Sequence, residues 1–207
     1  MTFTASMLGT YSFCPRMFYY RYVLGIEEPP NDLMRRGLLV HAIIAEIAKG
    51  NNPDIDSLVQ KYNYPYDDNV QAIIKLVNNR VLKEVEFTTV EERFDAKIEG
   101  IKFAGVVDAI TEDGTMIDWK VVSRIKKARD PLQLAIYAKV FPAKKFEYIQ
   151  LTEKGIYPVE FHPIDIASGW VRAKTLVNKI LRAEYPMNKT RYCPKCFYYP
   201  YCKKLNL

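Results

Sequence analysis

The stretch FAGVVDAITEDGTMIDWKVV, residues 103–122, decides the fold that the sequence predicts. Its apolar residues recur with a period close to two, which is typical of strands. The polar residues Glu-Asp-Gly-Thr at 112–115 interrupt that pattern and favour a turn. The stretch therefore predicts a β-hairpin with strands at 103–110 and 116–122.

Helical patterns lie on both sides of this hairpin, because apolar residues recur there at intervals of three and four. Helices are predicted at 11–25, 35–49, 67–85, 131–141 and 166–182, and a further strand at 146–152. This order of helices, strands, a helix and another strand indicates a mixed α/β core.

Each strand of the hairpin carries an aspartate beside apolar residues, Asp108 in the first and Asp118 in the second. A buried carboxylate is costly unless a cation or another partner compensates its charge. Lys120 follows Asp118 by two residues, so the pleat of a strand places both side chains on one face. Two carboxylates suit Mg²⁺, and the chemistry that follows is phosphodiester hydrolysis. A surface Asp–Lys pair on a hairpin would have the same spacing, so these three residues alone leave both interpretations open.

Four cysteines occur in the chain: Cys14 near one end, and Cys193, Cys196 and Cys202 near the other. In a reducing compartment, cysteines at this spacing more often bind metal or carry out redox chemistry than form disulfides. We expect the two ends of the chain to meet at a metal centre. Zinc and an iron–sulfur cluster both suit four thiolates, and two disulfides are a third alternative.

The composition indicates one domain and a polyanionic partner. With 207 residues, 49% of them hydrophobic, the chain can bury one good core or two small ones. An excess of 30 basic over 24 acidic residues gives a formal charge of +6, which favours nucleic acid. The N-terminus has no signal pattern, and no apolar run approaches the length of a membrane span. A cytoplasmic protein without membrane association is therefore predicted.

A histidine and a Gln–Tyr pair extend the pattern of motifs. A single histidine on an apolar helix, as His41 is, is more often a core residue than a ligand. The order of motifs changes that interpretation. The chain resembles the RecB-like branch of the PD-(D/E)XK superfamily in Gly37...His41, Gly105-Val-Val-Asp108, Asp118-Trp119-Lys120 and Gln133...Tyr137.

The layout of the cysteines is similar to that of the CRISPR-associated exonucleases of the Cas-four family, in which one cysteine before the nuclease core and three after it hold a [4Fe-4S] cluster. The resemblance covers nearly the whole chain. It implies a restriction-endonuclease-like fold with a central mixed sheet flanked by helices, in a single domain at 1–207. The nuclease core would span about 35–183, and segments 1–25 and 185–207 would form the cluster region.

The resemblance also implies roles for individual residues. His41, Asp108 and Asp118 would bind Mn²⁺ or Mg²⁺, with the backbone carbonyl of Trp119, and Lys120 would position or deprotonate the attacking water. Gln133 and Tyr137 would steer the substrate strand. A cluster held by Cys14, Cys193, Cys196 and Cys202 would have a structural role. Asp118 stands where many members of the superfamily have glutamate. A further carboxylate could come from Glu91 or Glu92, and the sequence does not say which.

The activity that the resemblance implies is hydrolysis of single-stranded DNA, mainly as an exonuclease that favours 5′ ends, with some endonuclease activity. A role in CRISPR spacer acquisition beside the integrase is implied as well, whereas a viral origin stays open. The alternative is a non-catalytic module that binds DNA ends or serves as a scaffold.

Basic and aromatic side chains could contact the DNA strand. Phosphate contacts are expected from Arg16, Arg21, Arg35, Arg36, Lys126, Lys127 and Arg129. The tyrosines at 11, 19, 20 and 22 could stack on bases, although we favour packing around the metal centre for most of them.

Overall fold

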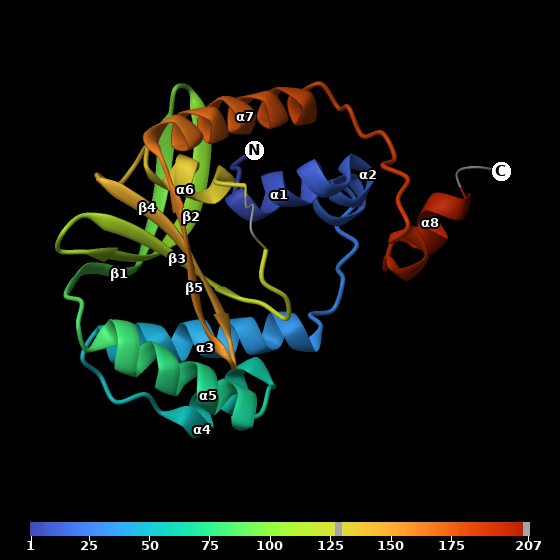
Figure 1. The fold of residues 1–207 in the computed structure, drawn as a ribbon. Helices are drawn as coiled ribbons and strands as arrows, with labels where there is room; N and C mark the ends of the chain where they lie inside the picture. The colour runs from blue at the N-terminus through green and yellow to red at the C-terminus, as the bar shows by residue number, and fades with distance from the viewer. Residues whose placement is uncertain (127–129, 205–207) are drawn as a thin grey trace.

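A five-stranded mixed sheet forms the centre of the molecule in the computed structural model, which describes residues 1–126 and 130–204 (Figure 1). The spatial order follows the sequence: β1 Phe87–Ile98, β2 Ile101–Thr111, β3 Thr115–Val121, β4 Lys145–Thr152 and β5 Gly155–Phe161. Only β3 and β4 pair in parallel, and the connection between them contains α6, Leu132–Tyr137. The predicted α/β class and mixed sheet are confirmed.

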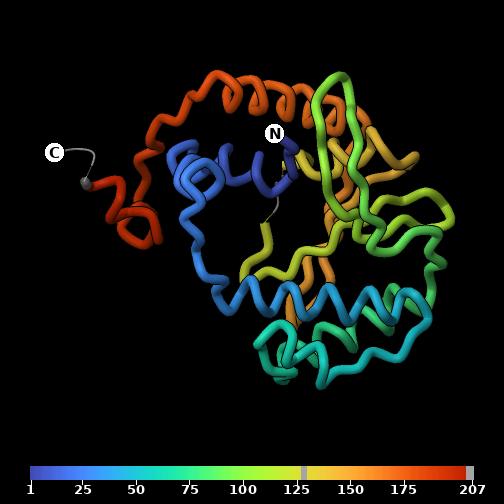
Figure 2. Tube along the Cα trace, turned by 180° about the vertical axis from the view of Figure 1, so that it is seen from behind, coloured from blue at the N-terminus to red at the C-terminus, as the bar shows by residue number. Residues whose placement is uncertain are grey.

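Helices cover both faces of the sheet (Figures 1 and 2). One side is covered by α1 Ala5–Phe13, α6 and α7 Pro163–Leu181, and the other by α3 Asp32–Ala48, α4 Ile55–Tyr62 and α5 Asp68–Val77. The shorter elements are α2 Pro15–Phe18, η1 Tyr19–Val23, η2 Asn78–Leu82, η3 Cys193–Lys195 and α8 Tyr199–Lys204. Among the helices of the described residues, none combines the length and apolarity that a bilayer crossing requires.

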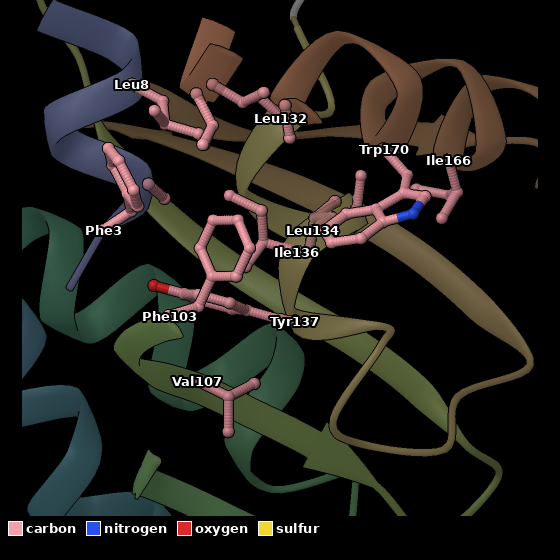
Figure 3. Packing of buried hydrophobic residues seen from close by; sticks show 14 of the residues in the cluster. Phe3, Leu8, Phe103, Val107, Leu132, Leu134, Ile136, Tyr137, Ile166 and Trp170 are labelled. Carbon is pink, nitrogen blue, oxygen red and sulfur yellow. The ribbon is translucent and has the colours of Figure 1, made fainter. Parts of the chain in front are cut away.

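Each face of the sheet has its own apolar core, as the alternation of side chains along a strand requires. Figure 3 shows the first core, in which Phe103 of β2 packs with Phe3, Leu134 and Trp170. The second core lies on the opposite face and contains Ile117 of β3. Met116 of β3 belongs to the first core and its neighbour Ile117 to the second, so their side chains point to opposite faces of the sheet.

The predicted hairpin is confirmed, but its ladder is short. Strands β2 and β3 are joined by a turn with Gly114 at a φ of +85°, and only Ala109–Ile117 and Ile110–Met116 pair between them. A second hairpin joins β1 to β2 through Glu99 and Gly100, both with positive φ, as a two-residue turn requires. The pairing between β2 and β3 therefore ends beside Asp108 and Asp118.

Several predicted boundaries were wrong. The helix predicted at 11–25 is a series of three short helices that begins at Ala5 and is interrupted at Cys14. The helix predicted at 131–141 extends only over α6, and the one predicted at 67–85 ends in the π-helical turn η2. Strand β5 lies outside the predicted elements, and it contains Pro158, a residue that disfavours strands. Because β5 is an edge strand, one side of its backbone has no neighbouring strand to pair with, and a proline is tolerated there.

The two ends of the chain pack against each other (Figures 1 and 2). The side-chain nitrogen of Asn188 donates to the backbone oxygen of Phe13 at 2.8 Å, and the Tyr198 hydroxyl donates to that of Ile26 at 3.0 Å. The rings of Tyr20 and Tyr198 stack with centroids 5.9 Å apart. Segments that lie more than 170 residues apart in sequence are therefore in contact.

Candidate active site

Three carboxylates lie side by side on three neighbouring strands. In the β1–β2 ladder Val90 pairs with Ala109 and Glu92 with Val107, so Glu91 faces Asp108. In the β2–β3 ladder Ala109 pairs with Ile117, so Asp108 and Asp118 occupy the next position, where the ladder ends. Strand pairing thus brings Glu91 and Asp108 together, and Asp118 lies on the adjoining strand outside the group whose ligand atoms are within 4.8 Å of one another.

His41 of α3 approaches Asp108 from the helical layer. Its Nδ1 lies 3.5 Å from Oδ2 of Asp108, and the backbone N–H of Trp119 donates to the same oxygen at 2.8 Å. Ligand atoms of His41, Glu91 and Asp108 all lie within 4.8 Å of one another. One imidazole and carboxylate oxygens form a donor set that fits a hard or borderline divalent cation.

Glu91, and not Glu92, belongs to this group. The backbone of Glu91 has a φ of +52°, which lies in the left-handed region and is uncommon for a residue other than glycine. The Glu91 side chain is half-buried, whereas that of Glu92 is exposed. Of the two glutamates between which the sequence did not decide, Glu91 is therefore the one that lies beside Asp108 and His41.

Asp118 and Lys120 form an ion pair on the adjoining strand. The Asp118 side chain is 2% exposed, and Nζ of Lys120 lies 2.5 Å from its Oδ2. Among the described residues, neither oxygen of this carboxylate accepts a hydrogen bond of good geometry. A buried carboxylate with an oxygen left over is the arrangement that a cation would complete.

Gln133 and Tyr137 lie behind Lys120. Nζ of Lys120 donates to Oε1 of Gln133 at 3.0 Å, and the Gln133 amide donates to the Tyr137 hydroxyl at 3.3 Å. Tyr137 is buried, with a ring carbon 2.9 Å from where a Cβ on Gly105 would stand. The absence of a side chain at Gly105 leaves room for the Tyr137 ring. Through their hydrogen bonds, Tyr137 and Gln133 fix the direction of the Lys120 ammonium. Their contact with a substrate strand stays a prediction.

Burial shifts the pKa values of the site. Desolvation raises the pKa of Asp108 to about 7, with a smaller effect of Glu91 in the same direction, although Lys120 opposes both. Desolvation likewise raises the pKa of Asp118 to about 6, again opposed by Lys120. The pKa of His41 is lowered, mainly because burial disfavours the imidazolium. Near neutral pH, without a cation, Asp118 is therefore mostly ionised, Asp108 is protonated in about half of the molecules and His41 is neutral, so binding of a cation would release a proton from Asp108.

A groove of about 840 Å³ leads to these residues. His41, Glu91 and Lys120 lie in its wall, together with Gly37. A Cβ on Gly37 would meet nothing within 4 Å, so this position leaves open space. Exposed aliphatic side chains and basic side chains line the rest of the groove, among them Leu33, Met34, Leu38, Lys49, Lys61 and Arg93.

A second hollow, of about 820 Å³, has the opposite character. Five acidic residues line it, against two basic ones, Arg80 and Lys145. The acidic residues are Glu84, Glu86, Glu112, Asp113 and Glu147. Phosphate would be repelled from this hollow and attracted to the groove beside His41.

The four cysteines lie in the region where the chain ends meet, but they are not gathered tightly. Among the described residues, no three of their sulfurs lie within 4.8 Å of one another. They are near enough to interact: burial is the main cause that raises the pKa of Cys202, and the charges of Cys14 and Cys193 raise it further. The iron–sulfur centre is not shown by this arrangement.

The predicted contact residues fall into two groups. Tyr11 and Tyr20 are buried and Tyr19 and Tyr22 half-buried, which agrees with the packing role favoured for most of them. Lys126 is exposed, and Arg16, Arg21, Arg35 and Arg36 are half-buried. Lys127 and Arg129 lie outside the described residues.

The sequence matches a model of the PD-(D/E)XK nuclease superfamily over residues 2–203. A crystal structure of a candidate exonuclease from Eubacterium rectale is similar in fold, with a TM-score of 0.70 at 13% identity over 97% of this chain and 87% of that one. LHK-Exo in complex with dAMP aligns at a TM-score of 0.48 and 11% identity over 88% and 89% of the two chains, and SSO0001 at 0.42 and 21% over 85% and 88%. No curated protein matches the chain.

Proposed function

Because the chain belongs to the PD-(D/E)XK nuclease superfamily, we propose that it is a metal-dependent deoxyribonuclease that hydrolyses phosphodiester bonds of single-stranded DNA. The observation that carries this proposal is the group of His41, Glu91 and Asp108, with the buried Asp118–Lys120 pair on the adjoining strand. Members of the superfamily use divalent cations, and this donor set suits one.

We assign His41, Asp108 and Asp118 as ligands of Mn²⁺ or Mg²⁺, with Glu91 as a further carboxylate. An imidazole ligand favours Mn²⁺ over the harder Mg²⁺. Such an ion supplies a Lewis acid that lowers the pKa of water and offsets charge in the transition state. The neutral form of His41, which burial favours, leaves a ring nitrogen able to bind it.

Lys120 has the position of a group that acts on the attacking water or on the phosphate. Its ammonium is paired with Asp118 and donates a hydrogen bond to Gln133, so its position is fixed while protons are left for the substrate. An ammonium at this place orients a water molecule and stabilises negative charge that develops on phosphate oxygens. Gln133 and Tyr137 act here through Lys120 as positioning residues.

The groove supports a single strand as substrate. Its basic residues suit phosphates, and the exposed aliphatic side chains of Leu33, Met34 and Leu38 suit bases that are free of a duplex. The name of the fold relative from Eubacterium rectale, a candidate exonuclease, agrees with action at DNA ends. We retain the preference for 5′ ends, some endonuclease activity, the cytoplasmic location and the role beside a CRISPR integrase as parts of the proposal.

We further propose that Cys14, Cys193, Cys196 and Cys202 hold a [4Fe-4S] cluster with a structural role. A tetrahedral zinc site with Zn–S bonds of about 2.3 Å needs sulfurs about 3.8 Å apart, and no three of these sulfurs come that close. A cluster of four irons is larger than a zinc ion, so it suits thiolate sulfurs that lie farther apart. Contacts between the chain ends, such as Tyr20 on Tyr198, support a centre that fastens them together.

Digestion of end-labelled DNA tests the nuclease proposal. We expect the wild-type protein to shorten single-stranded DNA with Mn²⁺ or Mg²⁺, to cleave duplex DNA less, and to stop when EDTA is added. Asp118→Ala should be inactive, and the ladders from 5′ and 3′ labels give the polarity. Binding of DNA without any cleavage by a metal-loaded wild-type protein would contradict the proposal and favour a non-catalytic end-binding module.

A further inference from the structure

A small aromatic hollow lies apart from the catalytic groove, where the chain ends meet. It has a volume of about 410 Å³, within the range of small-ligand sites. Its lining includes the rings of Phe13, Tyr192 and Phe197, and Cys196, one of the proposed cluster ligands, lies at its wall. These rings are 51%, 53% and 39% exposed, respectively, so they are large apolar surfaces that the fold does not bury.

The exposed rings stand on fixed supports. The backbone oxygen of Phe13 accepts the hydrogen bond from Asn188, and the ring of Phe197 packs edge-on against buried Tyr198 with centroids 5.1 Å apart. Rings that are held in place yet open to solvent lose little conformational entropy on binding a flat ligand. The ring of Phe197 and the backbone that carries Phe13 are therefore held in place for stacking.

Cations surround the rings. Lys126 and Lys195 both line the hollow and are exposed. Arg191 lies over the ring of Tyr192 with its guanidinium 5.2 Å from the centroid. Glu28 is the one acidic residue among those that line the hollow in the described part of the chain. Aromatic rings with lysines beside them match a ligand with a planar base and a phosphate.

Lys126 connects the hollow to the catalytic strand. Gln150 holds its backbone from both sides: Oε1 of Gln150 accepts from the Lys126 N–H at 2.9 Å, and Nε2 donates to the Lys126 oxygen at 2.9 Å. Gln150 is the β4 residue that pairs with Lys120. Lys126 follows Lys120 by six positions, so their backbones lie no more than about 22 Å apart, a distance that about six stacked nucleotides cover.

We propose that this hollow binds an unpaired base of the DNA strand whose scissile phosphate lies at Lys120, with Phe13 and Phe197 as stacking surfaces and Lys126 and Lys195 at the adjoining phosphates. The inference rests on the proposed function and adds to it a second contact point on the single strand. The hollow would hold the strand between cleavage events and favour substrates long enough to reach it.

The test measures binding of fluorescent oligothymidine to metal-free protein by anisotropy, so that no cleavage occurs. An oligomer of about twelve nucleotides, within the site size of single-strand binders, should reach the hollow, whereas one of about three should not. Phe13→Ala should weaken binding of the long oligomer roughly tenfold and leave the short one unchanged. Phe13→Trp should retain binding, and Ile164→Ala, at an exposed apolar residue of α7, is the matched control.

Phe197→Ala gives a second and independent variant, and its melting temperature shows whether the fold is kept. A long oligomer without bases should bind wild-type protein and Phe13→Ala equally, because the stacking partner is missing. If both alanine variants bind the long oligomer as tightly as the wild type, and the wild type still cleaves DNA, the inference is wrong and the nuclease proposal stands. If the wild type neither binds nor cleaves DNA, both are wrong.

Discussion

Asp118→Asn should gain stability relative to the wild type as the pH rises in the metal-free protein, although it removes a metal ligand. The Asp118 side chain is buried, and desolvation raises its pKa from 3.8 to about 6 in the folded protein. The folded protein therefore holds a proton on this carboxyl between about pH 4 and pH 6 that the unfolded chain releases. The stability that this bound proton contributes is fully present below about pH 4 and is lost as the pH rises through 6.

The size of the effect follows from the shift. Two pKa units at about 1.4 kcal/mol each give a loss of about 3 kcal/mol for the ionised aspartate. Asparagine carries no charge and avoids this cost. The free energy of unfolding of Asp118→Asn minus that of the wild type should therefore rise by about 3 kcal/mol between pH 4 and pH 8.

Urea unfolding in EDTA, followed by circular dichroism at several pH values, measures this difference. Asp95→Asn, at an exposed carboxylate of β1, is the matched control for the substitution. Excess Mn²⁺ should reverse the order at pH 8, because only the wild type keeps the full ligand set. A difference between Asp118→Asn and wild type that does not change with pH would refute the assignment of Asp118 as a buried, desolvated carboxylate.

Three further results are expected. Glu91→Gln should weaken Mn²⁺ binding in calorimetry by about tenfold, as loss of a charged ligand does, while Glu92→Gln should not; equal effects would exclude Glu91 as a ligand. Gly105→Ala should lower the free energy of unfolding by about 1–3 kcal/mol and slow cleavage, since a new methyl meets the ring of Tyr137; an unchanged stability would show that the ring can shift freely. Cys193→Ala should reduce iron and sulfide content and melting temperature together in anaerobically purified protein, and a full iron content in this variant would remove Cys193 from the cluster.

The catalytic strands could be predicted because their signals are local. The period of two in residues 103–122 predicted both strands, and it placed Lys120 on the same side as Asp118, where the structure has the ion pair. Helical spacing likewise placed Gln133 beside Tyr137, and their hydrogen bond agrees. These features depend only on neighbours in the chain, so composition and spacing suffice to find them.

Glu91 could not be assigned from the sequence, because its place depends on strand pairing and on a positive φ. Two adjacent glutamates on a strand point to opposite faces, and nothing local says which one faces Asp108. Register between β1 and β2 decides this, and register is a long-range property.

The aromatic hollow was also beyond the sequence. Phe13 and Phe197 lie 184 residues apart and meet only because the chain ends pack together. The tyrosines near the N-terminus are the aromatic residues that the sequence offers for stacking, and of these Tyr11 and Tyr20 are buried. Exposure of a ring depends on tertiary packing, and periodicity does not report it.

The most direct test of the metal-dependent nuclease compares cleavage and Mn²⁺ binding in the wild type and Lys120→Ala. Lys120 touches Asp118 and Gln133 but is not among the proposed ligands, so the variant should still bind Mn²⁺ in calorimetry. Its single-turnover cleavage of single-stranded DNA should fall by about 100-fold or more, as loss of a group that acts on the reacting atoms does. Cleavage by Lys120→Ala at the wild-type rate, with Mn²⁺ bound, would contradict the account of this active site.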